Sequence, residues 1–282
     1  MGPFRGNLGG ATTAAPTAIR QGAFIADLMT GENPTFPVTD PRTWYLLRKN
    51  GRNTFVGVQP NKGQAALDSL DRPENFWGVA QYPTVSNTAP ATDANCRFIF
   101  RNSAPFPVMT ATEILFMKAE AAYRKNDKAT ALTAYRDAIS LHFDLLTGTY
   151  NQNIPPGMEI TPAIKTSFLA NTLVVPASPA ELTLSKIMLQ KYIAMFGYGI
   201  LETWVDMRRF HYVDADPETG EQVYTGFTPP SGTDLFQDNG GKLVYRVRPR
   251  FNSEYVWNVN ELKRIGADRL DYHTFEQWFS QQ

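Results

Sequence analysis

The sequence predicts a mainly α-helical fold with long ordered loops and a few short strands. Two stretches, 110–143 and 178–209, repeat apolar residues at the spacing of one helix face. The 20 prolines and 20 glycines, somewhat above average, point to long loops between the helices. We expect one domain over residues 1–282, with a loop-rich part (1–109), a helical core (110–210) and an irregular C-terminal part (211–282).

The loop-rich part contains the candidate strands. Ala23–Met29 has the composition of a short helix or strand, and a series of prolines follows it. Three runs rich in β-branched and aromatic residues favour strands: Thr43–Leu47, Thr54–Val58 and Cys96–Phe100. Lys49–Gly51 is typical of a turn, so the first two runs are expected to form a hairpin.

A pair of antiparallel helices is expected at 110–143. Thr110 with Glu113 three residues later is a capping box, and residues 125–127 form a turn before a second helix. The spacing of Ala131 and Tyr135 matches part of a tetratricopeptide repeat, although an ordinary helical hairpin is the alternative. Since about three such repeats are needed to bury a core, this pair must find its neighbours elsewhere.

The second helical stretch has a clear start and an internal break. Ser178, Pro179 and Glu181 occupy the N-cap, N1 and N3 positions of a helix. Gly197–Gly199 predicts a kink or break before the pattern resumes at Ile200. We expect this stretch to pack against the helix pair through the apolar faces that both present.

Further elements are expected after residue 229. The run Lys242–Arg250 is a possible strand, and Asn258–Ile265 is a possible short helix.

Composition excludes several classes of function. The 27 basic and 27 acidic residues balance, so nothing favours nucleic acid as a partner. No apolar run approaches the ~18 residues of a membrane-spanning helix. The single cysteine, Cys96, and three distant histidines show no metal-ligand spacing, and we expect no metal or cofactor.

No catalytic motif is apparent, and we expect a protein that is not an enzyme. The nucleophile elbow, the phosphate-binding loop and the dinucleotide fingerprint are all missing from the sequence. Glu202 and Asp206 lie four residues apart on one helix face, and a hydrolase could use two acids. Because Arg209 follows Asp206 at ion-pair spacing, a salt-bridged helix end is the favoured interpretation.

Four residues of this helix are predicted to be structural: Trp204, Asp206, Arg208 and Arg209. Trp204 lies on the apolar face, so we expect it to be buried. Its replacement by alanine is then expected to lower the free energy of unfolding by about 3–5 kcal/mol. One of the two arginines is expected to pair with a carboxylate.

These stretches together resemble a known family. The chain contains EILFMKAEAAYRKNDKATALTAYRDAI, then QKYIA at 190–194 and ETWVDMRR at 202–209. Glu254 and Asn258, then Gly266, Asp268 and Trp278 follow at matching spacing. The pattern resembles the C-terminal half of SusD/RagB-type outer-membrane lipoproteins of the Bacteroidetes, whose fold combines tetratricopeptide-like helix pairs with long loops.

The resemblance has departures. Arg250 directly follows Pro249, where the family has a residue between proline and arginine, and Asn252 and Ser253 replace the usual Tyr-Pro. Members of the family are about twice as long and begin with a lipoprotein signal, so we expect this chain to be a partial form that lacks the N-terminal part and its lipid anchor.

The resemblance implies a surface-exposed outer-membrane protein, lipid-anchored in its full-length form. Such a protein would bind an oligosaccharide or another nutrient without enzymatic activity and pass it to a SusC-type TonB-dependent transporter. The alternative is a helical-repeat scaffold that binds a protein partner. Nutrient capture predicts solvent-facing rings in the loops of residues 40–95, whereas a scaffold predicts a concave helical groove without exposed aromatics.

The ligand site is expected in these loops. Trp77 and Tyr82 are candidates for stacking on the apolar face of a sugar, and Asn75 is the candidate hydrogen-bonding residue beside Trp77. Titration with a panel of oligosaccharides, in the wild type and in Trp77→Ala, would test this site.

Overall fold

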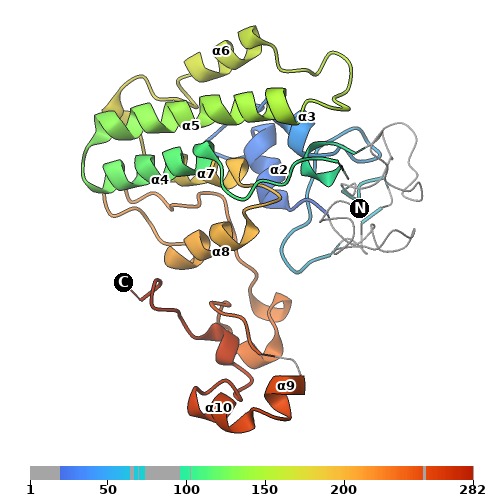
Figure 1. Cartoon of the computed structure of the whole chain (residues 1–282), viewed down its shortest axis with the longest axis vertical. Coiled ribbons are helices and arrows are strands. Elements are labelled where there is room, and N and C mark those ends of the chain that lie inside the picture. The colour runs from blue at the N-terminus through green and yellow to red at the C-terminus, as the bar shows by residue number, and fades with distance from the viewer. Residues whose placement is uncertain are drawn as a thin grey trace.

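The computed structural model describes residues 20–63, 67–68, 70–73, 96–101, 103–249 and 252–281, and these are mainly helical (Figure 1). The α-helices are α2 (Ala23–Thr30), α3 (Thr43–Leu46), α4 (Ala111–Arg124), α5 (Lys128–Thr149), α6 (Pro162–Ala170), α7 (Leu184–Ala194), α8 (Ile200–Arg209), α9 (Asn252–Tyr255) and α10 (Val259–Arg264). Short 3-10 turns are η1 (Phe98–Phe100), η2 (Pro179–Glu181), η3 (Gly232–Asp234), η4 (Gln237–Asn239) and η5 (Tyr272–Thr274). None of the described helices is both long and apolar enough to cross a bilayer.

Helices α4 and α5 form the expected antiparallel pair. The Thr110 hydroxyl accepts the Glu113 N–H at 3.2 Å and caps α4. The Asp127 carboxylate accepts the Thr130 N–H at 3.1 Å and caps α5. Ala131 and Tyr135 are fully buried, as their repeat-like spacing predicts.

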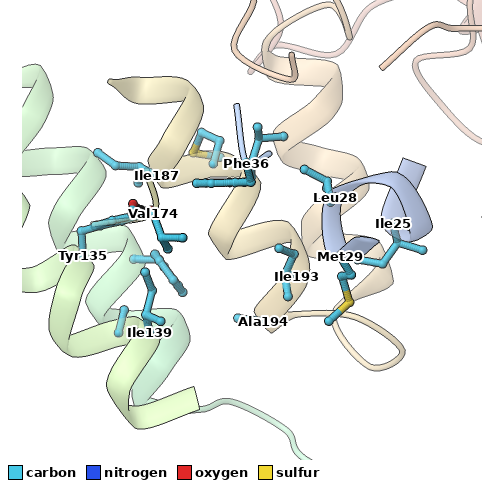
Figure 2. Packing of buried hydrophobic residues seen from close by; sticks show 14 of the residues in the cluster. Ile25, Leu28, Met29, Phe36, Tyr135, Ile139, Val174, Ile187, Ile193 and Ala194 are labelled. Carbon is cyan, nitrogen blue, oxygen red and sulfur yellow. Dashed lines mark hydrogen bonds between the residues drawn. The ribbon is translucent and has the colours of Figure 1, made fainter. Parts of the chain in front are cut away.

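Helix α7 packs against both members of this pair, as predicted, and α2 packs on α7 (Figure 1). Figure 2 shows Tyr135 and Ile139 facing Ile187, with Ile25 and Met29 of α2 on the opposite side of α7. The Tyr135 hydroxyl donates to the carbonyl of Val174 at 2.9 Å, so this core tyrosine is also satisfied as a polar group.

A buried polar network joins the N-terminal segment to two helices. The side chain of Arg42 is inaccessible to solvent and forms an ion pair with Asp40 at 2.5 Å. It also donates to Gln190 of α7 at 2.7 Å and lies 2.8 Å from Nδ1 of His142 on α5. Burial and, after it, the Arg42 charge hold the pKa of His142 well below 6.5, so this histidine is neutral and its Nδ1 accepts.

The predicted hairpin is wrong. Residues 43–46 form the helix α3, and Val58 makes only an isolated bridge to Gly22. Tyr45 and Leu46 are buried in a helical turn, so packing against the core outweighs their strand propensity. The turn at Asn50 does exist, since its side chain accepts the Arg52 and Thr54 N–H groups at 3.0 Å.

Two other candidate strands and the start of one helix differ from the predictions. The candidate strand Cys96–Phe100 contains the 3-10 turn η1, and residues 242–249 form no strand. Glu181 accepts the Ser178 N–H at 3.0 Å, but this box closes only the 3-10 turn η2. Helix α7 instead begins after Thr183, whose hydroxyl accepts the Lys186 N–H at 3.2 Å. The break at Gly197–Gly199 and the helix near Asn258 are present as predicted.

Candidate functional site

A sharp turn after α8 builds one wall of the candidate site. His211 and Tyr212 adopt φ values of 43° and 67°, in the left-handed region, and the Tyr212 N–H donates to the Met207 carbonyl at 2.8 Å. The turn brings the Tyr212 ring back beside Trp204, whose Nε1 donates to the tyrosine hydroxyl at 3.0 Å. The hydroxyl in turn donates to the Val244 carbonyl, which fixes the ring against the C-terminal segment.

A pocket of about 540 Å³ opens over this wall. Its floor is aromatic, because Tyr212 and Phe227 stack with ring centroids 6.3 Å apart and Trp204 lies beside them. The exposed ring of Phe236 and the ring of His273, 6.2 Å apart, also line the pocket. The other lining residues are Asn61, Pro229, Pro230, Leu235, Asn239, Leu243, Val244, Arg246, Val247 and Arg248.

Polar groups also line this pocket. Asn239 donates to the Lys242 carbonyl at 3.2 Å, which leaves its side-chain oxygen as the acceptor for Nε2–H of His273. Asn61 donates to the Asp234 carbonyl at 2.8 Å. Flat rings beside amides and guanidinium groups can hold a small ligand that has an apolar face and a polar edge.

Arg208 fastens the aromatic floor to the C-terminal segment. Its guanidinium lies 3.7 Å from the centre of the Trp204 ring and 4.9 Å from that of Phe279. It also donates to the Tyr245 carbonyl at 2.6 Å. Burial lowers the pKa of Arg208, yet a guanidinium keeps its charge at neutral pH.

An ion-pair network holds the other face of α8 against the helix pair. Asp206 is buried and accepts from Lys191 of α7 at 2.5 Å and from Arg209 at 3.0 Å. Arg209 also pairs with Glu120 of α4 at 2.8 Å. Burial would raise the pKa of Glu120, but its hydrogen bond to Arg209 and the charges of Arg209 and Arg124 outweigh burial and lower it.

Of the sequence-predicted residues, Trp204 departs from expectation. The ring is half-buried and lines the pocket, where burial in the core was predicted. The Arg208 guanidinium and the Tyr212 hydroxyl cover part of the ring, and the ring also borders the pocket. Asp206 and Arg209 form the ion pair that their spacing predicts, and Glu202 is exposed.

The remaining predicted ligand residues, Trp77, Tyr82 and Asn75, lie outside the described residues and stay a prediction. Most lining residues of the pocket were not identified from the sequence. Only Trp204 belonged to a recognisable motif, and the others come from four separate parts of the chain. Within the described ranges, no group of three or more histidine, cysteine or acidic side chains could hold a metal ion.

A histidine beside the site predicts a pH dependence of stability. Nδ1 of His211 lies 2.7 Å from Asp214, and Nε2 lies 3.6 Å from Glu276 of the C-terminal tail. The hydrogen bond to Asp214 and the negative charges of Asp214 and Glu276 outweigh burial and raise the pKa of His211 above 6.5. Protonation therefore ties the tail to the turn after α8.

The raised pKa of His211 sets the direction in which stability changes with pH. The stabilisation is complete below pH 6.5, the unfolded value, and is lost as pH rises through the higher folded value. We expect His211→Asn to lower the melting temperature more at about pH 6 than at about pH 8.5. An equal decrease at both pH values, measured by circular dichroism, would contradict this role.

Comparisons with known proteins come from sequence and structure. Residues 36–229 match the model of the SusD-like family, described as starch-binding and associating with the outer membrane. No curated protein matches the chain in sequence. The crystal structure of a SusD homologue from Bacteroides fragilis is similar, with a TM-score of 0.52 and 17% identity. The match covers 91% of this chain and 50% of the homologue, so the chain spans half the length of that protein.

Proposed function

The chain belongs to the SusD-like family, and from this premise we propose that it binds an oligosaccharide in the aromatic pocket beside α8. In this proposal the protein is a non-enzymatic nutrient-binding protein at the outer-membrane surface, lipid-anchored in its full-length form. It delivers the glycan to a SusC-type TonB-dependent transporter. The observation that carries the proposal is the floor of Trp204, Tyr212 and Phe227.

The dimensions and chemistry of the pocket support this function. Its volume of about 540 Å³ lies within the range of roughly 300–1,000 Å³ that is usual for small-molecule sites. A pyranose ring has an apolar C–H face that can lie on an aromatic ring and a rim of hydroxyls that hydrogen-bond to amides. Since Trp204 and Tyr212 are tied to each other and to the Val244 carbonyl, the floor is ordered before a ligand arrives.

A titration tests the proposal at a residue that is not needed for folding. Phe236 lines the pocket with 59% of its surface exposed, so Phe236→Ala removes a wall ring without opening the core. For a neutral or acidic oligosaccharide that binds, we expect calorimetry to show about a fivefold lower affinity for Phe236→Ala, which is the contribution of one aromatic contact. Trp257→Ala, at an 85% exposed ring outside the pocket, is the matched control and should bind as the wild type does.

Two outcomes would contradict the proposal. If Phe236→Ala binds as tightly as the wild type, the glycan does not lie in this pocket. If no oligosaccharide of the panel binds the wild type, glycan binding itself is wrong.

The alternative function, a scaffold for a protein partner, is favoured by a different surface. Ile114 and Met117 of α4 and Ile200 and Leu201 of α8 are exposed apolar side chains. A protein partner could cover them, but this function assigns no role to the aromatic pocket. Glycan binding that depends on Phe236 therefore separates the two functions.

A further inference from the structure

Two arginines line the pocket, and neither pairs with a carboxylate in the part of the chain that the structure describes. Arg246 donates to two backbone carbonyls, that of Phe275 at 2.7 Å and that of Glu276. Arg248 donates to the Asp268 carbonyl at 3.4 Å, and its buried Nε makes no hydrogen bond. Within the described ranges, no ion pair joins either arginine to an acidic side chain. Carbonyl oxygens satisfy N–H groups but do not neutralise a full charge.

Three acidic side chains of this region face other cations. Asp234 pairs with Lys62 at 2.8 Å, and Asp271 pairs with Arg269 at 2.9 Å. The Glu276 carboxylate faces His211 at 3.6 Å. None of these carboxylates lines the pocket, whose charged side chains are the two guanidinium groups; its other polar groups are two amides, one imidazole, the Tyr212 hydroxyl and the Trp204 indole N–H. The lining of the pocket therefore contains two positive charges and no carboxylate.

This charge lies next to apolar surface. The Arg248 guanidinium lies 5.6 Å from the ring centre of Tyr255, and that of Arg246 lies 4.9 Å from Tyr272. Aromatic surroundings exclude water and so strengthen the attraction for an anion. A guanidinium also presents a planar fork of donors that matches the two oxygens of a carboxylate or sulfate. A neutral sugar hydroxyl would use these groups less well.

We propose that the ligand of this pocket is an acidic oligosaccharide, whose carboxylate or sulfate group pairs with Arg248 while its ring lies on the aromatic floor. Arg246 adds a second positive charge to the pocket lining and holds the tail through the carbonyls of Phe275 and Glu276. This inference rests on the proposed function, because it specifies the class of glycan that the same pocket takes.

Pairs of ligands that differ in an acidic group test this inference without any change to the protein. We would titrate the wild type with oligogalacturonate and with its methyl ester, which differ in charge but share the same sugar rings. Sulfated and desulfated chondroitin oligosaccharides form the second pair; both keep the glucuronate carboxylate, so this pair tests the sulfate alone. We expect at least one pair in which the member with the additional acidic group binds about tenfold more tightly than its partner, and its affinity to fall as salt is added.

Variants of Arg248 test whether this residue causes the preference for an acidic oligosaccharide. Arg248→Gln should abolish the preference for the acidic member, and Arg248→Lys should keep part of it because the charge remains. Arg264→Gln is the control, since Arg264 pairs with Glu261 on α10 and does not line the pocket. Circular dichroism would verify that each variant is folded.

The outcomes separate this inference from the proposed function. Equal affinity for both members of each pair, together with weaker binding by Phe236→Ala, would overturn the inference that the ligand is acidic. It would leave the proposal of glycan binding in this pocket intact. An acid preference that survives in folded Arg248→Gln would also overturn it. If no neutral or acidic glycan binds the wild type, the proposed function and this inference both fail.

Discussion

Replacing Arg42 with methionine is expected to lower the free energy of unfolding by about 3–5 kcal/mol, because the substitution leaves the buried carboxylate of Asp40 without its partner. The guanidinium also donates to Gln190 and contacts His142, so α5 and α7 lose their shared polar link to the N-terminal segment. Urea unfolding of the variant and the wild type measures the change.

A double variant separates the charge from the packing. Asp40→Asn together with Arg42→Met removes both charges, and it should be less destabilised than Arg42→Met alone. Arg52→Met is the surface control, since this arginine is exposed and solvent screens its ion pairs with Asp68 and Asp71, so it should change stability far less than Arg42→Met. A loss below about 1 kcal/mol in Arg42→Met would contradict the importance of the network.

The second large effect is expected at Asp206. Asp206→Ala leaves the nearly buried ammonium of Lys191 without a counter-charge and removes one partner of Arg209. Because breaking a buried pair costs more than the pair contributes, we expect a loss of about 3–5 kcal/mol. Chemical unfolding measures it, and Glu202→Ala on the same helix, at an exposed position, should change stability by less than about 0.5 kcal/mol.

A double variant tests whether the loss in Asp206→Ala comes from the unpaired charge of Lys191 or from the shorter side chain. Lys191→Met combined with Asp206→Leu replaces the ion pair with apolar groups and should recover part of the lost stability. If Asp206→Ala is as stable as Glu202→Ala, the network does not hold α8 against α7.

The helical core could be predicted because its signals are local. The capping residues Thr110 and Asp127 lie at the starts of α4 and α5, and the apolar positions repeat over many turns. The ion pair between Asp206 and Arg209 follows from positions on one helix. Its further partners, Lys191 and Glu120, lie on other helices, and no spacing in the sequence predicts them.

The misassigned strands show where local composition is insufficient. Thr43–Leu46 has the residues of a strand, yet Asp40 accepts the backbone N–H of Arg42 at 2.9 Å and starts a helical turn there. The buried network around Arg42 then holds this turn against α5 and α7. The deciding contacts are with residues about 100 or more positions away, so a short window cannot reveal them.

The pocket could not be predicted for the same reason. Asn61, Tyr212, Phe236 and His273 share no motif and meet only because the chain reverses after α8 and returns along Val244. The half-buried state of Trp204 also depends on that reversal. The helix motif identified Trp204 only as a structural residue, and the tertiary structure shows that it lines the pocket.

The most direct test of the central claim is a crystal structure of the protein with an oligosaccharide that binds in the titration. We expect a sugar ring over Tyr212 and Phe227, beside Trp204, with its acidic group at Arg248. A glycan bound at any other surface, with this pocket empty, would contradict the assignment of the site.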